Sequence, residues 1–248
     1  MTDVTPERFQ QHASSFDRAA DVYERARPSY PADAVEWLLA SNPATSVDLG
    51  AGTGKFTRLI ADRTRVIAID PSEKMLEHIV GEKRVGTGEA IPLPDHSVDA
   101  VFSAQAWHWV DPVKGPAEVA RVLVPGGTLG LIWNARDDRE PWIAEMSSTI
   151  HDGPSAELKE FPPTLGEQFG EIEFFETVWT HDLDRDEIEE LVASRSHFIV
   201  QDAAAQAKIL SELRGLLDTH PDTKGLLRIP VPYRTFAYRA ATLDLPQD

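Results

Sequence analysis

Glycine recurs at alternate positions in one short loop of the sequence, VDLGAGTG at Val47–Gly54. Glycine permits positive φ angles and lets a ligand approach the backbone closely. The apolar residues before the loop predict a β-strand, and the pattern after it predicts a helix, whose first amide groups face the turn. The loop is therefore a candidate site for a nucleotide-like cofactor.

The spacing within this loop distinguishes three classes of cofactor. A P-loop needs Ser or Thr directly after its Gly-Lys pair to reach magnesium, whereas Phe56 follows Gly54-Lys55 here. The dinucleotide fingerprint places its third glycine three positions after the second, where this chain has Lys55, so NAD or FAD binding is the weaker alternative. The remaining pattern is G-x-G-x-G, with Asp48 two residues before the first glycine.

An acidic residue, Asp70, ends the second predicted strand, twenty positions beyond Gly50. A carboxylate at this place can accept hydrogen bonds from both hydroxyls of an unphosphorylated ribose. The topological switch between the first and fourth strands would bring the loop and this acid to one crevice. The loop and the acid therefore support each other.

Longer segments carry a resemblance to a known family. They are VDLGAGTGKFT at Val47–Thr57, VIAIDPSEKML at Val66–Leu76, GEAIPLPDHSVDAVFSAQAWHWV at Gly88–Val110 and RVLVPGGTLGLIWN at Arg121–Asn134. In their order and spacing, the chain resembles the class I S-adenosylmethionine-dependent methyltransferases of the small-molecule type (methyltransferase type 11). Phe16–Pro31 is also similar to the branch that includes trans-aconitate-type methyltransferases. The resemblance covers roughly the first half of the chain.

The resemblance implies S-adenosylmethionine as the cofactor and assigns roles to single positions. It places Asp48 near the ammonium group, Gly50 and Gly52 near the methionine part, and Asp70 at the ribose hydroxyls. Met75 matches a position that packs against adenine, although a core methionine fits its helical pattern equally well. The residues expected to bind the cofactor are Asp48, Gly50, Ala51, Gly52, Thr53, Asp70, Pro71, Met75, Gly88, Glu89, Ala104, Gln105, Tyr23 and Arg27.

Two parts of this assignment carry alternatives. Many family members have Asp where this chain has Thr87, so the adenine contact is assigned to the backbone of Gly88 and Glu89. The segment Tyr23–Tyr30 can fold over the crevice as a lid, where Arg27 would pair with the cofactor carboxylate through a bidentate fork. A surface ion pair is the alternative role of Arg27.

The acceptor side is assigned to a polar and aromatic cluster, Ser103–Trp109, after the fourth predicted strand. His108 is the candidate catalytic residue, because its pKa suits removal of a proton from a hydroxyl acceptor. A carboxylate acceptor needs no base, and His108 then makes only a fixed hydrogen bond. Arg195–His197 join a cap over the site if the later helices fold back. The residues expected to bind the substrate are Trp107, Trp109, Tyr30, Trp133 and Asn134.

These motifs require a sheet that positions them. The α/β pattern and the resemblance imply a Rossmann-like fold: a seven-stranded, mostly parallel sheet in the order 3-2-1-4-5-7-6, with helices on both faces and one antiparallel strand. One domain is expected over residues 1–248. Its expected parts are an N-terminal helical lid (1–40), a cofactor-binding core (44–135), helical cap elements with an edge strand (140–232) and a last strand (233–241).

Composition limits the function further. A formal net charge of −17 disfavours nucleic acid as the partner, since such binding draws on basic side chains. The chain has no cysteine, which excludes thiolate metal sites, and no His, Asp and Glu spacing predicts another metal site. The absence of a signal-peptide pattern and of a long apolar stretch predicts a cytoplasmic protein without membrane contact.

The sequence thus predicts a methyltransferase that acts on a small-molecule acceptor at oxygen, in a carboxylate or a hydroxyl. An RNA methyltransferase and a non-catalytic S-adenosylmethionine-binding regulator are the alternatives. The acceptor and the oligomeric state stay open.

Overall fold

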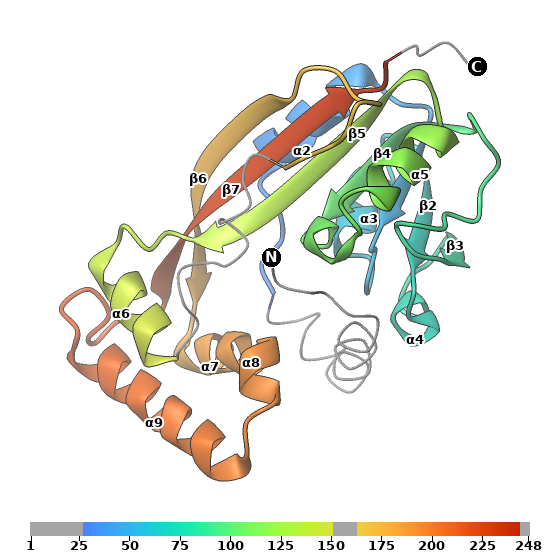
Figure 1. Cartoon of the computed structure of the whole chain (residues 1–248). Coiled ribbons are helices and arrows are strands. Elements are labelled where there is room, and N and C mark those ends of the chain that lie inside the picture. The colour runs from blue at the N-terminus through green and yellow to red at the C-terminus, as the bar shows by residue number, and fades with distance from the viewer. Residues whose placement is uncertain (1–26, 151–162, 244–248) are drawn as a thin grey trace.

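The computed structural model describes residues 27–150 and 163–243 and contains a seven-stranded sheet in the order β3-β2-β1-β4-β5-β7-β6 (Figure 1). β7 is antiparallel to β5 and β6, and the other pairs are parallel. The predicted strand order and the single reversed strand are confirmed. Tyr23 and the rest of the predicted lid up to residue 26 lie outside the described residues. The strands are β1 (Thr45–Leu49), β2 (Arg65–Asp70), β3 (Glu82–Val85), β4 (Val98–Ala104), β5 (Leu123–Arg136), β6 (Glu173–Leu183) and β7 (Ile229–Ala241).

The glycine loop leaves the middle of this sheet, at the end of β1. Val47 pairs with Ile67 of β2 on one side and with Val101 of β4 on the other, so the order of the chain reverses at β1. Ligands of open α/β sheets bind in the crevice outside such a switch point. Val47, Asp48 and Leu49 are all buried, as expected for a parallel strand that is covered on both faces.

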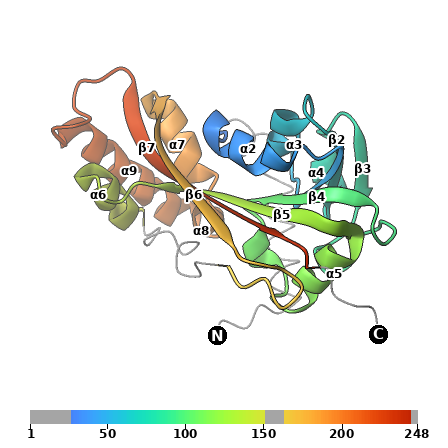
Figure 2. The ribbon, with the colours of Figure 1, turned by 90° about the horizontal axis from the view of Figure 1, so that it is seen from above.

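Helices cover both faces of the sheet, with α2 and α3 on one side and α5 on the other (Figure 2). On the first face Leu38 and Phe56 pack in one cluster with Phe102 of β4. On the second face Val119 and Val122 pack in the largest cluster of the sheet. The helices are α2 (Ala32–Leu38), the 3₁₀ turn η1 (Leu39–Ser41), α3 (Lys55–Ile60), α4 (Glu73–Leu76), the 3₁₀ turn η2 (Trp107–Trp109), α5 (Lys114–Val122), α6 (Pro141–Thr149), α7 (Arg185–Ala193), α8 (Ser196–Ile199) and α9 (Ala203–Thr219).

A second hydrophobic core lies where the long strands β5, β6 and β7 extend past the rest of the sheet (Figure 1). There α6, α7 and α9 pack against Leu183 of β6 and against Val231 and Tyr233 of β7. A capping box between Asp184 and Glu187 starts α7 directly after β6. This helical unit stands beside the carboxyl ends of the parallel strands and therefore supplies a second wall for a site at the switch point.

β7 begins at Ile229, four residues before the strand start that the sequence predicts at Tyr233. Pro230 and Pro232 interrupt the strand pattern, because proline cannot donate to a sheet ladder. In this stretch β7 pairs with β6, while β5 ends at Arg136, opposite Tyr233. Neither proline lies in the part of β7 that pairs with β5, so the missing N–H groups do not disturb that pairing. The strand therefore continues through Pro230 and Pro232.

The spacing of Met75, Leu76, Ile79 and Val80 predicts a helix that runs through all four residues, but the observed helix is shorter. α4 ends at Leu76, and Val80 is fully exposed. Nζ of Lys83 donates to the carbonyl oxygens of Leu76 (2.8 Å) and Ile79 (3.0 Å). These bonds satisfy acceptors at the helix end, so the chain can turn into β3.

Pro125, Gly126 and Gly127 predict a break between helix and strand, but β5 starts directly after α5, at Leu123, and includes these residues. Its pairing with β4 shifts there: Val98 lies opposite Leu123, and Ala100 lies opposite Thr128. The extra residues form an irregularity of the kind that lets a strand continue past a turn-like segment.

Candidate functional site

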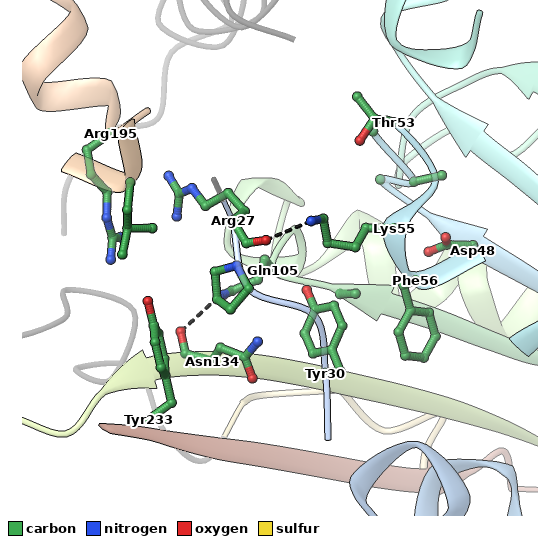
Figure 3. Close-up of a pocket in the computed structure, with 16 residues that line it drawn as sticks. Arg27, Tyr30, Asp48, Thr53, Lys55, Phe56, Gln105, Asn134, Arg195 and Tyr233 are labelled. Atoms are coloured by element: carbon green, nitrogen blue, oxygen red, sulfur yellow. Dashed lines mark hydrogen bonds between the residues drawn. The ribbon is translucent and has the colours of Figure 1, made fainter. Parts of the chain in front are cut away.

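A pocket opens at the switch point, between the glycine loop and the helical unit (Figure 3). Three parts of the chain supply its walls: the segment before α2, the carboxyl ends of β1, β4 and β5, and the region of α7 and β7. Figure 3 places Asp48, Thr53 and Lys55 on one side and Arg195 and Tyr233 on the other. The lining residues are Arg27, Pro28, Tyr30, Asp48, Gly50, Ala51, Gly52, Thr53, Lys55, Phe56, Ala104, Gln105, Asn134, Leu191, Arg195 and Tyr233.

The glycine loop turns back over the end of β1 in a conformation that needs glycine. Gly50, Gly52 and Gly54 have φ angles of 73°, 54° and 85°. The N–H of Gly50 donates to the carbonyl of Ile69 at 2.8 Å, which holds the turn against β2. A Cβ on Gly50 would collide with the Cβ of Ala106. The loop therefore presents backbone, rather than side chains, to the pocket.

Asp48 places a buried carboxylate under this loop. One oxygen, Oδ2, accepts a hydrogen bond from Oγ1 of Thr57 at 2.6 Å. The other, Oδ1, is buried and has no hydrogen-bond partner among the described residues. Burial raises the pKa of Asp48 from 3.8 to about 7; the bond from Thr57 opposes this rise, and the charge of Asp70 adds to it. A cationic ligand group in the pocket would satisfy Oδ1 and favour the ionised form.

Asp70 joins the two predicted cofactor motifs. Its Oδ2 accepts from the backbone N–H of Gly52 at 2.8 Å, and its Oδ1 accepts from the N–H of Ser72 at 2.9 Å. Ser72 in turn caps α4, since its Oγ accepts from the N–H of Met75 at 3.2 Å. Asp70 thus orients the glycine loop, although it is not among the residues that line the pocket.

The segment before α2 is tied across the pocket by hydrogen bonds. Nδ2 of Asn134 donates to the carbonyl of Ser29 at 2.9 Å, and Oδ1 of Asn134 accepts from Oγ1 of Thr235 at 2.6 Å. Nζ of Lys55 donates to the carbonyl of Arg27 at 2.6 Å (Figure 3). Asn134 therefore uses its side chain to hold this segment in place.

Gln105 stands at the end of β4 in a strained backbone conformation, with φ at 57°. Its N–H donates to Ile132 at 2.9 Å, and Nε2 donates to the carbonyl of Asn134 at 2.8 Å. Its Oε1 is buried without a hydrogen-bond partner among the residues that the structure describes. Positive φ in a residue other than glycine is costly and is often found at functional sites. Gln105 therefore offers the pocket an acceptor at a fixed position.

The helical unit supplies the opposite wall. The ring of Tyr233 stacks on that of Trp179, with centroids 5.3 Å apart and planes 24° apart. The backbone of Arg195 is fixed between two helices, because its N–H donates to Val192 at 3.1 Å and its carbonyl accepts from Phe198 at 3.0 Å. The side chain of Arg195 lines the pocket.

The pocket lining contains Arg195 of the predicted cap and ten of the residues predicted to bind cofactor or substrate: Arg27, Tyr30, Asp48, Gly50, Ala51, Gly52, Thr53, Ala104, Gln105 and Asn134. The other predicted residues that the structure describes lie outside that lining. These are Asp70, Pro71, Met75, Gly88, Glu89, Trp107, His108, Trp109 and Trp133.

The aromatic cluster differs most from its expected place. Trp107 begins the turn η2 rather than continuing β4, and it is buried in the core beneath the sheet. Trp133 is buried in the same core, edge-to-face with Tyr238 at 6.1 Å. His108 lies beside Trp109, with ring centroids 4.8 Å apart. For Trp133 the reason is the alternation of side chains along β5. Trp133 and Asn134 point to opposite faces of the sheet, and of these two only Asn134 lines the pocket.

Gly88 and Glu89 form part of a loop that packs against the segment after η2. A Cβ on Gly88 would lie 2.7 Å from the side chain of Val110, so only glycine fits there. Oε1 of Glu89 accepts from the N–H of Asp111 at 2.7 Å. The Glu89 side chain is thus engaged within the protein, which leaves its backbone for the predicted adenine contact.

Sequence reasoning did not assign Pro28, Lys55, Phe56, Leu191 or Tyr233 to the site. Lys55 and Phe56 directly follow the glycine loop, and this adjacency could have indicated them. Leu191 and Tyr233 carry no local signal, since only the packing of the helical unit against β7 brings them to the pocket.

The described residues hold no group of three or more His, Asp or Glu side chains that could bind a metal ion. Nor do their helices include one that is long and apolar enough to cross a membrane.

Comparisons with known proteins agree with this geometry. The model of the methyltransferase domain family matches residues 47–131. An uncharacterized methyltransferase of Mycobacterium bovis is 44% identical over 233 residues, covering 91% of this chain and 95% of that protein. A solved structure of a proposed type II methyltransferase from Anaeromyxobacter dehalogenans has the same fold, with a TM-score of 0.68 at 24% identity over 89% of this chain and 99% of that one.

A shorter match covers 103 residues, 37% of this chain, at 38% identity: it is the malonyl-[acyl-carrier protein] O-methyltransferase of Methylococcus capsulatus, of which 38% is matched. The chain belongs to the class I methyltransferases, and S-adenosylmethionine is its cofactor. The protein is thus an S-adenosylmethionine-dependent methyltransferase.

Proposed function

We propose that this enzyme transfers a methyl group to an oxygen atom of a small molecule. The observation that carries the proposal is the pocket, in which one wall is the glycine loop and the opposite wall is Leu191, Arg195 and Tyr233 of the helical unit. Such an arrangement gives the cofactor and the acceptor separate walls of one enclosed space.

Residues of the first wall would hold the cofactor. The unsatisfied Oδ1 of Asp48 suits the ammonium group, and the exposed backbone of Gly50 and Gly52 suits a ligand that lies on the loop. Arg27 lines the same space and suits the carboxylate through a bidentate fork. When bound, S-adenosylmethionine supplies a methyl group on a positively charged sulfur.

The reaction needs alignment more than acid–base chemistry. An acceptor oxygen donates a lone pair to the methyl carbon, and the bond from that carbon to sulfur breaks with its electrons left on sulfur. Fixing two reactants in attack geometry supplies roughly 7–11 kcal/mol of the barrier. The firmly tied segment from Arg27 to Tyr30 and the fixed amide of Gln105 provide such positioning.

Two observations favour oxygen and a small molecule. The partial match to malonyl-[acyl-carrier protein] O-methyltransferase concerns transfer to oxygen. The formal net charge of −17 disfavours RNA, since phosphate contacts draw on basic surface.

The test is incubation with S-adenosylmethionine labelled in the methyl group and a metabolite extract, followed by mass spectrometry of the labelled products. We expect one small methyl ester or methyl ether. Label on nitrogen, carbon or sulfur, or only on RNA, would contradict the proposal. Tight cofactor binding without methyl transfer to any acceptor would favour the alternative of a non-catalytic regulator that binds S-adenosylmethionine.

A hydroxyl acceptor would need a base, and His108 is the candidate that the sequence predicts for that role. His108→Ala would then lower kcat at least tenfold and remove a pKa from the pH–rate profile.

A further inference from the structure

We propose that two copies of this chain associate through β6, by antiparallel pairing of the two β6 strands about a twofold axis. The interface is the outer edge of β6, that is, the backbone N–H and C=O groups that point away from β7. The sheets of the two copies would then form one continuous sheet. This inference goes beyond methyl transfer and does not depend on the acceptor.

The sheet ends in two edge strands of different character. β3, at one edge, has four residues, of which Glu82, Lys83 and Arg84 are charged. Short length and charged side chains are features with which natural proteins prevent edge strands from pairing. β6, at the other edge, has eleven residues and pairs with β7 along its whole length without a register shift (Figure 1). It contains neither lysine nor proline, so its sequence does not block pairing.

Alternate residues of β6 point their backbone groups to the outer edge. On the β5 side of β7, the N–H of Thr242 donates to the carbonyl of Gly127 at 2.8 Å. On the β6 side, the carbonyl of Ala241 accepts from the N–H of Gly170 at 2.9 Å. Because backbone groups alternate along a strand, odd-numbered residues of β7 face β6, and the register pairs them with odd-numbered residues of β6. The even-numbered residues of β6 therefore point outward: Phe174, Glu176, Val178, Thr180 and Asp182.

Most of these outward groups are available to another strand. At the end of β6, the carbonyl of Asp182 accepts from the guanidinium of Arg228. The outward backbone groups of the other four residues, from Phe174 to Thr180, have no hydrogen-bond partner in the part of the chain that the structure describes. Such groups are a template for β-strand addition, in which main-chain hydrogen bonds supply the affinity.

The side chains of the same residues form an exposed and partly apolar face. Phe174 is 51% exposed and Val178 is 60% exposed. Glu176, which lies between them, forms an ion pair with Arg234 of its own chain at 2.7 Å. The chain carries a formal net charge of −17, yet at this edge the central carboxylate has a counter-charge. Local repulsion against a second copy is therefore small.

A second copy fits this edge because the strand is complementary to itself, as a twofold interface requires. With the axis at Val178, all of Glu173–Leu183 overlaps, Val178 meets its counterpart, and Glu176 lies opposite Thr180 of the second copy. An axis at Thr177 would set Val178 against Glu176. An axis at Glu176 would set two carboxylates against each other, which is destabilising. The axis at Val178 therefore gives the best match.

The first experiment is sedimentation velocity of the full chain over a range of protein concentrations and of salt. We expect a monomer–dimer equilibrium, since one pair of strands is a small interface. The dimer should become more stable as salt is raised, because salt screens the repulsion between two acidic chains. A monomer at every concentration would overturn the inference. A dimer that dissociates as salt is raised would also overturn it, because ion pairs would then hold the interface.

The second experiment changes the edge. We expect Val178→Lys to raise the dissociation constant of the dimer at least tenfold, since it places two ammonium groups at the axis. The matched control is Val85→Lys on β3, where Val85 is 54% exposed; its dimer should be that of the wild type. Thr180→Pro removes one outward N–H and leaves the pairing with β7 intact, so it should weaken the dimer as well. A wild-type dimer in Val178→Lys and Thr180→Pro would place the interface elsewhere and overturn the inference.

The third experiment tests the register. The chain has no cysteine, so Val178→Cys introduces a single thiol. Residues opposite each other in a hydrogen-bonded antiparallel pair have Cα atoms about 5.5 Å apart, which suits a disulfide. With diamide as the oxidant, we expect a covalent dimer of Val178→Cys on a non-reducing gel and a monomer for the control Val85→Cys. No covalent dimer of Val178→Cys, or equal amounts in both variants, would overturn the proposed pairing.

Discussion

The carboxylate of Asp70 accepts a hydrogen bond from the backbone N–H of Gly52, 2.8 Å away and eighteen residues earlier in the chain. The acid at the end of β2 therefore shapes the loop at the end of β1. The same carboxylate holds the N–H of Ser72, where α4 begins. One side chain thus sets the position of the glycine loop relative to the start of α4.

We expect Asp70→Ala to weaken S-adenosylmethionine binding by about 2–3 kcal/mol, because the loop loses an anchor and the ribose hydroxyls lose their predicted acceptor. Calorimetric titration measures this. Ser72→Ala is the control, since it removes the cap of α4, at a cost to stability of about 1 kcal/mol, and leaves the bond from Asp70 to Gly52. Near-wild-type affinity in Asp70→Ala would remove Asp70 from the site.

The buried carboxyl of Asp48 makes folding stability depend on pH. Its pKa is about 7 in the folded chain against 3.8 as the ordinary value, so the folded state holds a proton that the unfolded state releases between these values. The contribution of Asp48 to the free energy of unfolding is fully present below pH 3.8 and is lost as the pH rises to about 7. The full loss is on the order of 4 kcal/mol.

Asp48→Asn removes this titration. Relative to wild type without cofactor, the variant should gain stability as the pH rises from 4 to 8, by up to about 4 kcal/mol in urea unfolding. Glu82→Gln is the control at a partly exposed position, where hydrogen bonds from Arg84 and Arg65 lower the pKa. Parallel stability curves for wild type and Asp48→Asn would show that Asp48 is ionised throughout.

Gly50 combines a φ of 73° with contact against Ala106. We expect Gly50→Ala to lower the free energy of unfolding by about 2–4 kcal/mol, from backbone strain and from the collision of two Cβ atoms. Adding Ala106→Gly to this variant should recover the part of the lost unfolding free energy that comes from the collision. The part that comes from backbone strain should remain. If the second substitution recovers nothing, the two residues are not in contact.

Asn134 ties Ser29 to Thr235 through both ends of its side-chain amide. We expect Asn134→Ala to release the segment from Arg27 to Tyr30, seen as faster amide hydrogen exchange there, and to lower kcat/KM at least tenfold. Thr235→Val breaks the same chain of bonds one step further away and should have a smaller effect. Unchanged exchange at residues 27–30 would mean that other contacts hold the segment.

Local patterns were sufficient for the central strands and for the loop between them. Buried Val and Ile runs, the three glycines and the acid after β2 each depend on neighbours in the chain, so residues 47–70 could be assigned from sequence. The N-cap Ser72 of α4 is a local feature of the same kind. The predictions were wrong where a contact outside the local periodicity decides where an element ends. The Lys83 side chain binds acceptors at the end of α4, and pairing with β6 extends β7 through Pro230 and Pro232.

The sequence by itself therefore determined the class of the fold and the cofactor, and it indicated the glycine-loop wall of the pocket, because these rest on short-range spacing. On the opposite wall the sequence named only Arg195, as part of a cap that depends on how the later helices fold back, and tertiary structure decided the rest. Arg195 and Tyr233 reach the pocket only because the helical unit packs on the extended ends of β6 and β7, and Trp133 leaves it because strand alternation turns it into the core. Such placements depend on how buried surfaces fit together across distant segments, which no local spacing records.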